Sequence, residues 1–237
     1  GRSSSSASLE ISGGSDGEDG KGFIVHVTRL IERLNTILCN SARASKFEGD
    51  NEMTIDLIHR IAKGYTNAPS LRVTWLENLA DFHVQKKNYA EAAMCHIHIA
   101  AMVTQFLVDS GSKVRGVPQE GCKAFAIVSP NSLEELAISE AQSSIATDES
   151  VASVDQSTIT AEKLILHITL ALEELKKADL YEASNLLYKL LLPIYEAKRE
   201  YEKLLQSHED LRQVFEEVQR CIKLQSRMLG SYYRVGF

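Results

Sequence analysis

Apolar residues recur at helical spacing along most of the chain. A 4-3-4-3 spacing places five apolar residues on one face of a helix over about residues 23–44: Phe23, Val27, Leu30, Leu34 and Ile37. The same apolar face is widened by Ile24, Ile31 and Leu38. A face this wide is typical of a helix that packs against two neighbours. The pattern therefore predicts a helical layer rather than an isolated coil.

The second predicted helix begins at Asp50 or Asn51, because either side chain can cap the first turn. It ends at Gly64 or Asn67, and Pro69 fits the first position of the next helix. Residues 69–108 then predict a helical hairpin with Lys87 and Asn88 in its turn. We expect its first helix to present Leu71, Trp75, Leu79 and Phe82, and its second to carry Ala92, Ala93, Ile97, Ala100, Ala101, Val103 and Phe106.

Residues 158–197 predict a second hairpin that repeats the first. Leu79 precedes Ala92 by thirteen residues, as Leu170 precedes Ala183, and Asn88 corresponds to Asp179 in the turn. Tetratricopeptide-like repeats typically have Leu and small residues on the first helix, a tight turn, and a small residue on the second helix where the backbones cross. We therefore expect an all-α fold, an antiparallel array of right-handed helical hairpins over residues 23–230.

Two segments depart from this helical pattern. Residues 1–22 contain seven Ser and six Gly, which predicts a flexible lead-in. Residues 110–157 predict an irregular insert, with an ordered excursion at 121–130 and a disordered acidic part near 141–157. Within the insert, Ser132 and Glu135 have the spacing of a capping box, which predicts a short helix start.

The last predicted helix runs from about Arg199 to Leu229. Its apolar stripe consists of Leu211, Phe215, Val218, Ile222 and Leu229, broadened by Val214, Cys221, Leu224 and Met228. A long helix with so wide a stripe either closes a core or pairs with a partner helix. After Gly230 the aromatic residues of 231–237 predict the extended start of a further lobe.

Composition excludes several classes of protein. The net charge of −6 argues against nucleic-acid binding, which needs a basic surface. No apolar run approaches the roughly 20 residues of a membrane span. Lys189 interrupts the best candidate, so we expect no direct membrane insertion. The four cysteines match no zinc pattern and predict reduced thiols in a cytoplasmic protein. The chain does not begin with Met, so we expect a piece of a longer protein.

The sequence offers little for catalysis. His96 and His98 lie two apart on a predicted helix and so face different directions, which favours a core or interface role over a metal site. Glu134 and Glu135 also diverge on a helix and are best explained as a solvated capping turn. No phosphate-binding glycine loop or nucleophile elbow occurs. We therefore expect no catalytic residue, no cofactor and no metal.

Four segments together resemble the DOCK family of guanine-nucleotide exchange factors, within its DOCK homology region 2. They are residues 53–103, 121–131 (GCKAFAIVSPN), 191–205 (LLPIYEAKREYEKLL) and 228–237 (MLGSYYRVGF). They cover well over half of the chain. The stretch 132–190 departs from animal members, and the mixture resembles plant Spike-type as much as zizimin-type proteins.

The resemblance implies that this chain is the first of three lobes. In the family this helical lobe supports the other two and commonly mediates homodimerisation, while the second and third bind a Rho-family small GTPase and release its nucleotide. It implies a scaffold and dimerisation lobe without enzyme activity of its own, in a cytoplasmic parent protein that signals to the cytoskeleton. Any membrane association is expected from other parts of the parent.

Surplus apolar surface on a helical array indicates an interface. The expected partner surface is the last two helices and the terminal arm, with ordinary core packing as the alternative for each residue. The candidate interface residues are Tyr195, Leu205, Phe215, Leu224, Tyr232, Tyr233 and Phe237.

Two other functions stay open. A tetratricopeptide-like adaptor would bind a peptide in its concave groove, where Asn78, Lys86, Asn185 and Lys189 are available polar residues. A stand-alone enzyme has no support from any motif.

Overall fold

The computed structural model describes residues 50–65, 68–111, 114–136 and 159–224, together with nine positions between 27 and 42. The described α-helices are α2 (Asn51–Gly64), α3 (Pro69–Gln85), α4 (Tyr89–Asp109), α7 (Ala161–Lys177), α8 (Tyr181–Lys198) and α9 (Tyr201–Leu224). Two 3₁₀ helices, η1 (Gly121–Ile127) and η2 (Pro130–Leu133), lie between α4 and α7 in the sequence. No described residue is in a strand, which confirms the predicted all-α class.

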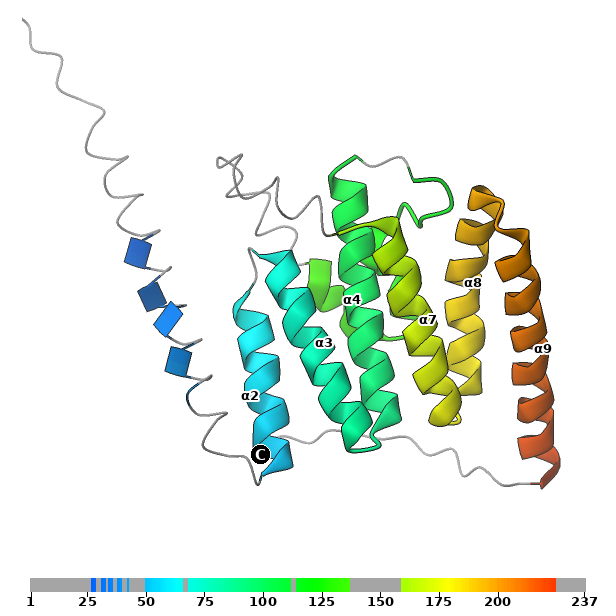
Figure 1. Ribbon diagram of the computed structural model, residues 1–237, viewed down its shortest axis with the longest axis horizontal. Coiled ribbons are helices and arrows are strands. Elements are labelled where there is room, and N and C mark those ends of the chain that lie inside the picture. Colours follow the sequence, from blue (N-terminus) through cyan, green and yellow to red (C-terminus); the bar gives the residue numbers. More distant parts are fainter. Residues whose placement is uncertain are drawn as a thin grey trace, which may run out of the picture.

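The helices stand side by side in the order α2, α3, α4, α7, α8 and α9, each packed against the next (Figure 1). Successive helices run in opposite directions, as predicted for an antiparallel array. The core is centred on α4, which packs against α3 on one side and α7 on the other. The residues of α4 that are fully buried there include Ala93, Ile97, Ile99, Ala100, Ala101 and Val103. Small side chains on α4 permit this close approach.

Local capping explains where these helices begin. The Asp50 carboxylate accepts a hydrogen bond from the Met53 N–H at 3.1 Å, which confirms the predicted cap of α2. Pro69 occupies the first turn of α3, where its missing N–H costs nothing. α2 ends at Gly64, as predicted. Thr160 caps α7 in the same way as Asp50 caps α2.

The two hairpins share the same turn geometry, but not in the predicted register. Lys87 and Asp179 both adopt a left-handed conformation, with φ of 61° and 57°. Since 92 positions separate these residues, and also separate Tyr89 from Tyr181 at the next helix starts, the repeat is 92 residues rather than 91. Lys87, not Asn88, is therefore the counterpart of Asp179. The tetratricopeptide-like assignment itself stays a prediction.

The buried face of α3 differs from the predicted one. Leu71 is exposed and Trp75 and Phe82 are only partly buried, whereas Leu79 is buried as expected. The side chains that face the core are Arg72, Val73, Leu76, Leu79, Ala80 and His83. The prediction rested on hydrophobicity alone, and it missed that this face buries an arginine and a histidine.

Residues 114–136 form a strap across the array. Near its start Gly116, with φ of 86°, lies so close to α8 that a Cβ atom there would stand 2.3 Å from the carbonyl oxygen of Pro193. In its middle the Cys122 N–H donates to Gln105 Oε1 of α4 at 3.1 Å. The predicted ordered excursion at 121–130 is confirmed by η1 and by the start of η2. The predicted disordered part near 141–157 lies outside the described residues.

The strap ends at a buried ion pair. Arg72 donates from Nε and Nη2 to the two carboxylate oxygens of Glu135, at 2.9 and 2.7 Å, and both side chains are 2% exposed or less. Arg72 Nη1 also donates to the Ala62 carbonyl at the end of α2. The prediction of a capping box was therefore wrong: Glu135 turns inward to Arg72, and the Ser132 hydroxyl is buried without a hydrogen-bond partner. Glu134 is exposed, but Glu135 is not part of a solvated turn.

The composition of helix α4 bears on the expectation that the chain does not insert into a membrane. By length and composition it could cross a bilayer, but 61% of its most apolar window is buried inside the protein. It is thus the core helix of the array. In the sequence analysis the run at Lys189 is the best candidate span, but α4 is the more apolar of the two segments. No other helix of the described residues meets this criterion.

The predicted ends of the chain are only partly described. The described positions between 27 and 42 are helical, as expected, but Ile31, Leu34 and Leu38 are exposed rather than packed between two neighbours. The lead-in at 1–22 and the arm at 231–237 lie outside the described residues. The last helix is described to Leu224, and its predicted continuation to Leu229 lies beyond that point.

Candidate functional site: the α9 surface, a groove and two buried polar clusters

Helix α9 presents two faces that differ in burial. Its inner face packs on α8 through Leu204, Ser207, Leu211, Val214, Val218 and Cys221, which alternate at spacings of three and four. Its outer face carries Tyr201, Leu205, Phe215 and Ile222, all exposed. Tyr201, Phe215 and Ile222 are separated by multiples of seven residues and so lie along one line of the helix. We call these four residues the α9 outer face.

The predicted interface residues fall into three groups. Leu205 and Phe215 are 74% and 49% exposed and belong to the α9 outer face. Leu224 is also exposed, but it lies nine residues after Phe215, which is two and a half turns, and so points the opposite way. Tyr195 is 6% exposed and packs between α8 and α9, so its ring is core rather than surface. Tyr232, Tyr233 and Phe237 lie outside the described residues.

Two residues of the α9 outer face were missed in the sequence analysis. Ile222 belonged to the predicted core stripe of the last helix, but it is 70% exposed. Tyr201 was not considered. The signal that could have found both is the second apolar line on α9, seven residues in period, beside the one that packs on α8.

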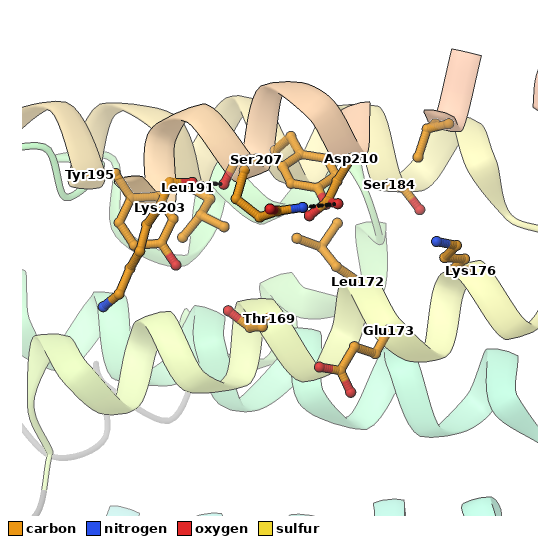
Figure 2. A pocket seen from close by; sticks show the side chains of 13 residues that line it. Thr169, Leu172, Glu173, Lys176, Ser184, Leu191, Tyr195, Lys203, Ser207 and Asp210 are labelled. Atoms are coloured by element: carbon orange, nitrogen blue, oxygen red, sulfur yellow. Dashed lines mark hydrogen bonds between the residues drawn. The ribbon is translucent and has the colours of Figure 1, made fainter. Parts of the chain in front are cut away.

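A groove lies between α7 and α9, with α8 at its base (Figure 2). Its volume is about 270 Å³. Apolar atoms of Leu172, Leu191 and Val214 form its floor, and charged or polar side chains stand on its two walls. The polar residues proposed for a concave groove, Asn78, Lys86, Asn185 and Lys189, do not line it. We call this feature the α7–α9 groove.

The histidines of α4 serve the core, as the sequence indicated. His96 Nδ1 lies 3.2 Å from Nδ1 of His167 on α7, and His167 Nε2 lies 3.2 Å from a carboxylate oxygen of Glu77 on α3. Burial, and next the neighbouring His167, lower the pKa of His96 to about 4. The contact with His167 is the largest of the effects that lower the pKa of Glu77, followed among the lowering effects by the charge of Lys163. This chain of polar contacts joins three helices with His96 neutral at pH 7.

His98 completes the second buried cluster. Its Nδ1 lies 3.0 Å from Glu135 Oε1, beside Arg72. Burial raises the pKa of Glu135, but hydrogen bonds from His98 and Arg72 outweigh that effect and hold the pKa below its ordinary value. Glu135 is therefore an ionised carboxylate with its partners in place. The described residues contain no group of three or more His, Cys, Asp or Glu that could hold a metal ion.

The geometry defines a class of protein: an antiparallel helical array with an apolar outer face on its last helix and a polar groove beside it. Residues 56–220 match the family described as DHR-2, Lobe A. The chain therefore belongs to the DHR-2 Lobe A family, the first lobe of DOCK homology region 2, as the sequence resemblance indicated.

Named relatives agree with this membership. The chain is 39% identical over 215 residues to human Dedicator of cytokinesis protein 8 and 38% identical over 221 residues to mouse Dedicator of cytokinesis protein 7. It is 33% identical over 215 residues to mouse Dedicator of cytokinesis protein 9. Each match covers 91% of this chain and 10% of the relative. The chain thus spans about a tenth of the length of the curated relatives it matches.

Proposed function

We propose that this chain is the scaffold and dimerisation lobe of a guanine-nucleotide exchange factor for Rho-family small GTPases. The GTPase-binding catalytic lobes would lie outside this chain. Membership of the DHR-2 Lobe A family supports the exchange-factor role. The α9 outer face is the observation that carries the dimerisation role, because four large apolar side chains stand exposed at one end of the array.

Several observations favour a support role within this proposal. The core of α4, the strap and the Arg72–Glu135 ion pair tie the array together from α2 to α8, which suits a rigid platform. Cys95, Cys122 and Cys221 are free and buried, which agrees with a reducing, cytoplasmic setting for the parent protein. Cytoplasmic localisation is part of the proposal.

Light scattering coupled to size exclusion tests the dimer. We expect the chain, whose mass is 26.3 kDa, to approach twice that mass as its concentration rises. The double variant Phe215→Glu/Ile222→Glu should weaken the association roughly tenfold or more, because charges would enter the centre of an apolar contact. The matched control is Met53→Glu, which places a charge on the partly exposed methionine of α2 at the far end of the array. A chain that stays monomeric at every concentration would contradict the dimer.

Nucleotide release tests the exchange-factor role. A Rho-family GTPase loaded with fluorescent GDP is mixed either with this chain or with a longer protein that carries its native continuation. We expect release only with the longer protein, since the catalytic lobes are proposed to lie there. Release by this chain alone would overturn the assignment of lobes, and no release by either protein would overturn the proposed activity.

A further inference from the structure

A histidine stands in the middle of the α9 outer face. Tyr201, His208, Phe215 and Ile222 follow one another at intervals of seven residues, or two turns of α9. Successive members of this line are displaced by only about 20° round the helix, so all four point to the same side. His208 is exposed, as the other three are. A partner that covers both Tyr201 and Phe215 must therefore cover His208 as well.

The charged side chains next to His208 on α9 are already paired with one another. Arg212 follows one turn later and about 40° round the helix. Its guanidinium is paired with Glu209 at 2.7 Å and with Glu216, and these residues lie further round in the same direction, about 100° and 80° from His208. Helix α8 packs on the inner face of α9, which lies round the helix in the opposite direction. The arginine thus stands between the histidine and the two carboxylates, so neither is positioned to pair with a protonated His208.

Protonation of His208 would place a charge inside a contact that is otherwise apolar. Histidine is the side chain whose charge ordinarily changes between pH 5 and pH 8. A partner can cover a neutral imidazole at a smaller cost than a charged one, which loses more hydration and needs a carboxylate partner. The separated chains therefore hold this proton, and the associated pair excludes it. An association that excludes protons is strong at high pH and weakens as the pH falls.

We propose that His208 makes the association of two copies through the α9 outer face sensitive to pH. The pair is stable while His208 is neutral, and it separates more readily when His208 is protonated. Carboxylates and guanidinium groups keep their charges between pH 6.0 and pH 7.5, so the histidine is the group of this surface that titrates. This regulation rests on the proposed dimerisation and adds the condition that turns it on and off.

The test measures the dissociation constant of the dimer at pH 7.5 and pH 6.0 by analytical ultracentrifugation over a series of concentrations. We expect the constant to rise roughly 5- to 15-fold at pH 6.0, because each pair must release up to two protons to form. Circular dichroism at both pH values checks that the chain stays folded. A dimer with the same constant at both pH values would overturn the pH control and leave the dimerisation in place. A chain that is monomeric at every pH and concentration would instead overturn the dimerisation, and this regulation with it.

Two replacements of His208 and a control assign the effect to this residue. His208→Gln is neutral at every pH, so it should associate equally well at pH 7.5 and pH 6.0. His208→Lys is charged at both, so it should raise the dissociation constant roughly 10-fold at pH 7.5 and show little further change at pH 6.0. His59→Gln, which alters an exposed histidine of α2 at the far end of the array, should keep the full response to pH. A response that survives His208→Gln, or a His208→Lys chain that associates as tightly as the unaltered one, would sink the proposal.

Discussion

At one end of the array the exposed side of α2 carries mainly charged and polar side chains, whereas at the other end that of α9 carries four large apolar side chains beside its ion pairs. On α2, Asp56 and Arg60 form an exposed ion pair one turn apart at 2.8 Å. On α9, Tyr201, Leu205, Phe215 and Ile222 have no cover within the described part of the chain. A helix at the end of a stack needs a polar outer face to be a terminus. The comparison teaches that α9, unlike α2, presents an apolar surface of the kind that a partner covers.

The two ends also differ in how they are held. The α2 end is joined to α3 and the strap by the buried Arg72–Glu135 pair, which also binds the carbonyl of Ala62. The α9 end is held by one helix, α8, through a narrow apolar line. We therefore expect substitutions to cost most stability near α2 and least on the outer side of α9.

The largest effect is expected from Arg72→Ala. Removing the guanidinium leaves the Glu135 carboxylate buried without its main partner, which should lower the free energy of unfolding by about 3–5 kcal/mol. Urea denaturation measures it. Arg60→Ala, which breaks the exposed pair on the same end, should cost no more than about 0.5 kcal/mol.

Replacing Arg72 and Glu135 together separates the cost of an unpaired buried charge from the cost of lost packing. Arg72→Met with Glu135→Leu removes both charges together, so it should recover most of the loss caused by Arg72→Ala. If Arg72→Ala costs no more than Arg60→Ala, the buried pair does not hold the α2 end and the contrast between the ends fails.

The next effect concerns the strap where it meets α8. Gly116→Ala should destabilise by roughly 2–4 kcal/mol, because the new Cβ meets the Pro193 carbonyl at 2.3 Å and φ is positive. Gly111→Ala is the matched control: its φ is 66°, but no atom lies within 4 Å of its Cβ position. Thermal and urea unfolding measure both variants. Gly116→Ala should lose more free energy of unfolding than Gly111→Ala, because only its new Cβ meets the Pro193 carbonyl. Equal losses would mean that the strap does not bear on α8.

Acid should weaken the centre of the array before either outer surface. The pKa of His96 is about 4 in the fold and 6.5 ordinarily, so the unfolded chain takes up a proton first as the pH falls between these values. Above pH 6.5 the neutral His96 costs the fold nothing. Between pH 7 and pH 5 its low pKa should reduce the free energy of unfolding by about 2 kcal/mol. His167 on α7 and Glu77 on α3 face the same group. Urea unfolding at the two pH values measures the change.

A matched pair of histidine variants tests the assignment. His96→Gln should flatten the dependence of stability on pH, whatever its effect on stability at pH 7. His208→Gln, on the exposed side of α9, should leave the dependence as it is in the unaltered chain. An unchanged slope in His96→Gln would show that other groups cause the acid loss.

The smallest effect is expected on the α9 outer face. Phe215→Ser should change the stability of the monomer by no more than about 0.5 kcal/mol, because its side chain is half exposed. Val214→Ser, the preceding residue on the buried side, should cost roughly 2 kcal/mol. Urea unfolding at low protein concentration excludes any contribution from association. A large loss from Phe215→Ser would mean that this residue belongs to the core and that the α9 end is not an open surface.

Much of the fold could be predicted from the sequence because helix limits depend on neighbouring residues. The cap at Asp50, the proline at the start of α3 and the two hairpin turns are local features, and all were found. The repeat register was off by one because the turn is set by the residue with positive φ, Lys87, which no hydrophobic pattern identifies.

The parts that failed depend on contacts between distant residues. Glu135 pairs with Arg72, 63 positions earlier, and its spacing from Ser132 pointed to a local cap instead. Tyr195 and Ile222 were misplaced because α8 and α9 carry apolar residues on more than one side, and periodicity alone does not say which side meets a neighbour. The groove combines side chains from three helices and has no signature in any one of them.

The strap has a practical consequence for engineering. Glu135 and Ile159, which flank residues 137–158, are both buried, so the chain is anchored on either side of that stretch. Extra length inserted between two fixed anchors costs little closure entropy. A fluorescent reporter or purification tag inserted there should leave helix packing intact, because both anchoring residues stay in place.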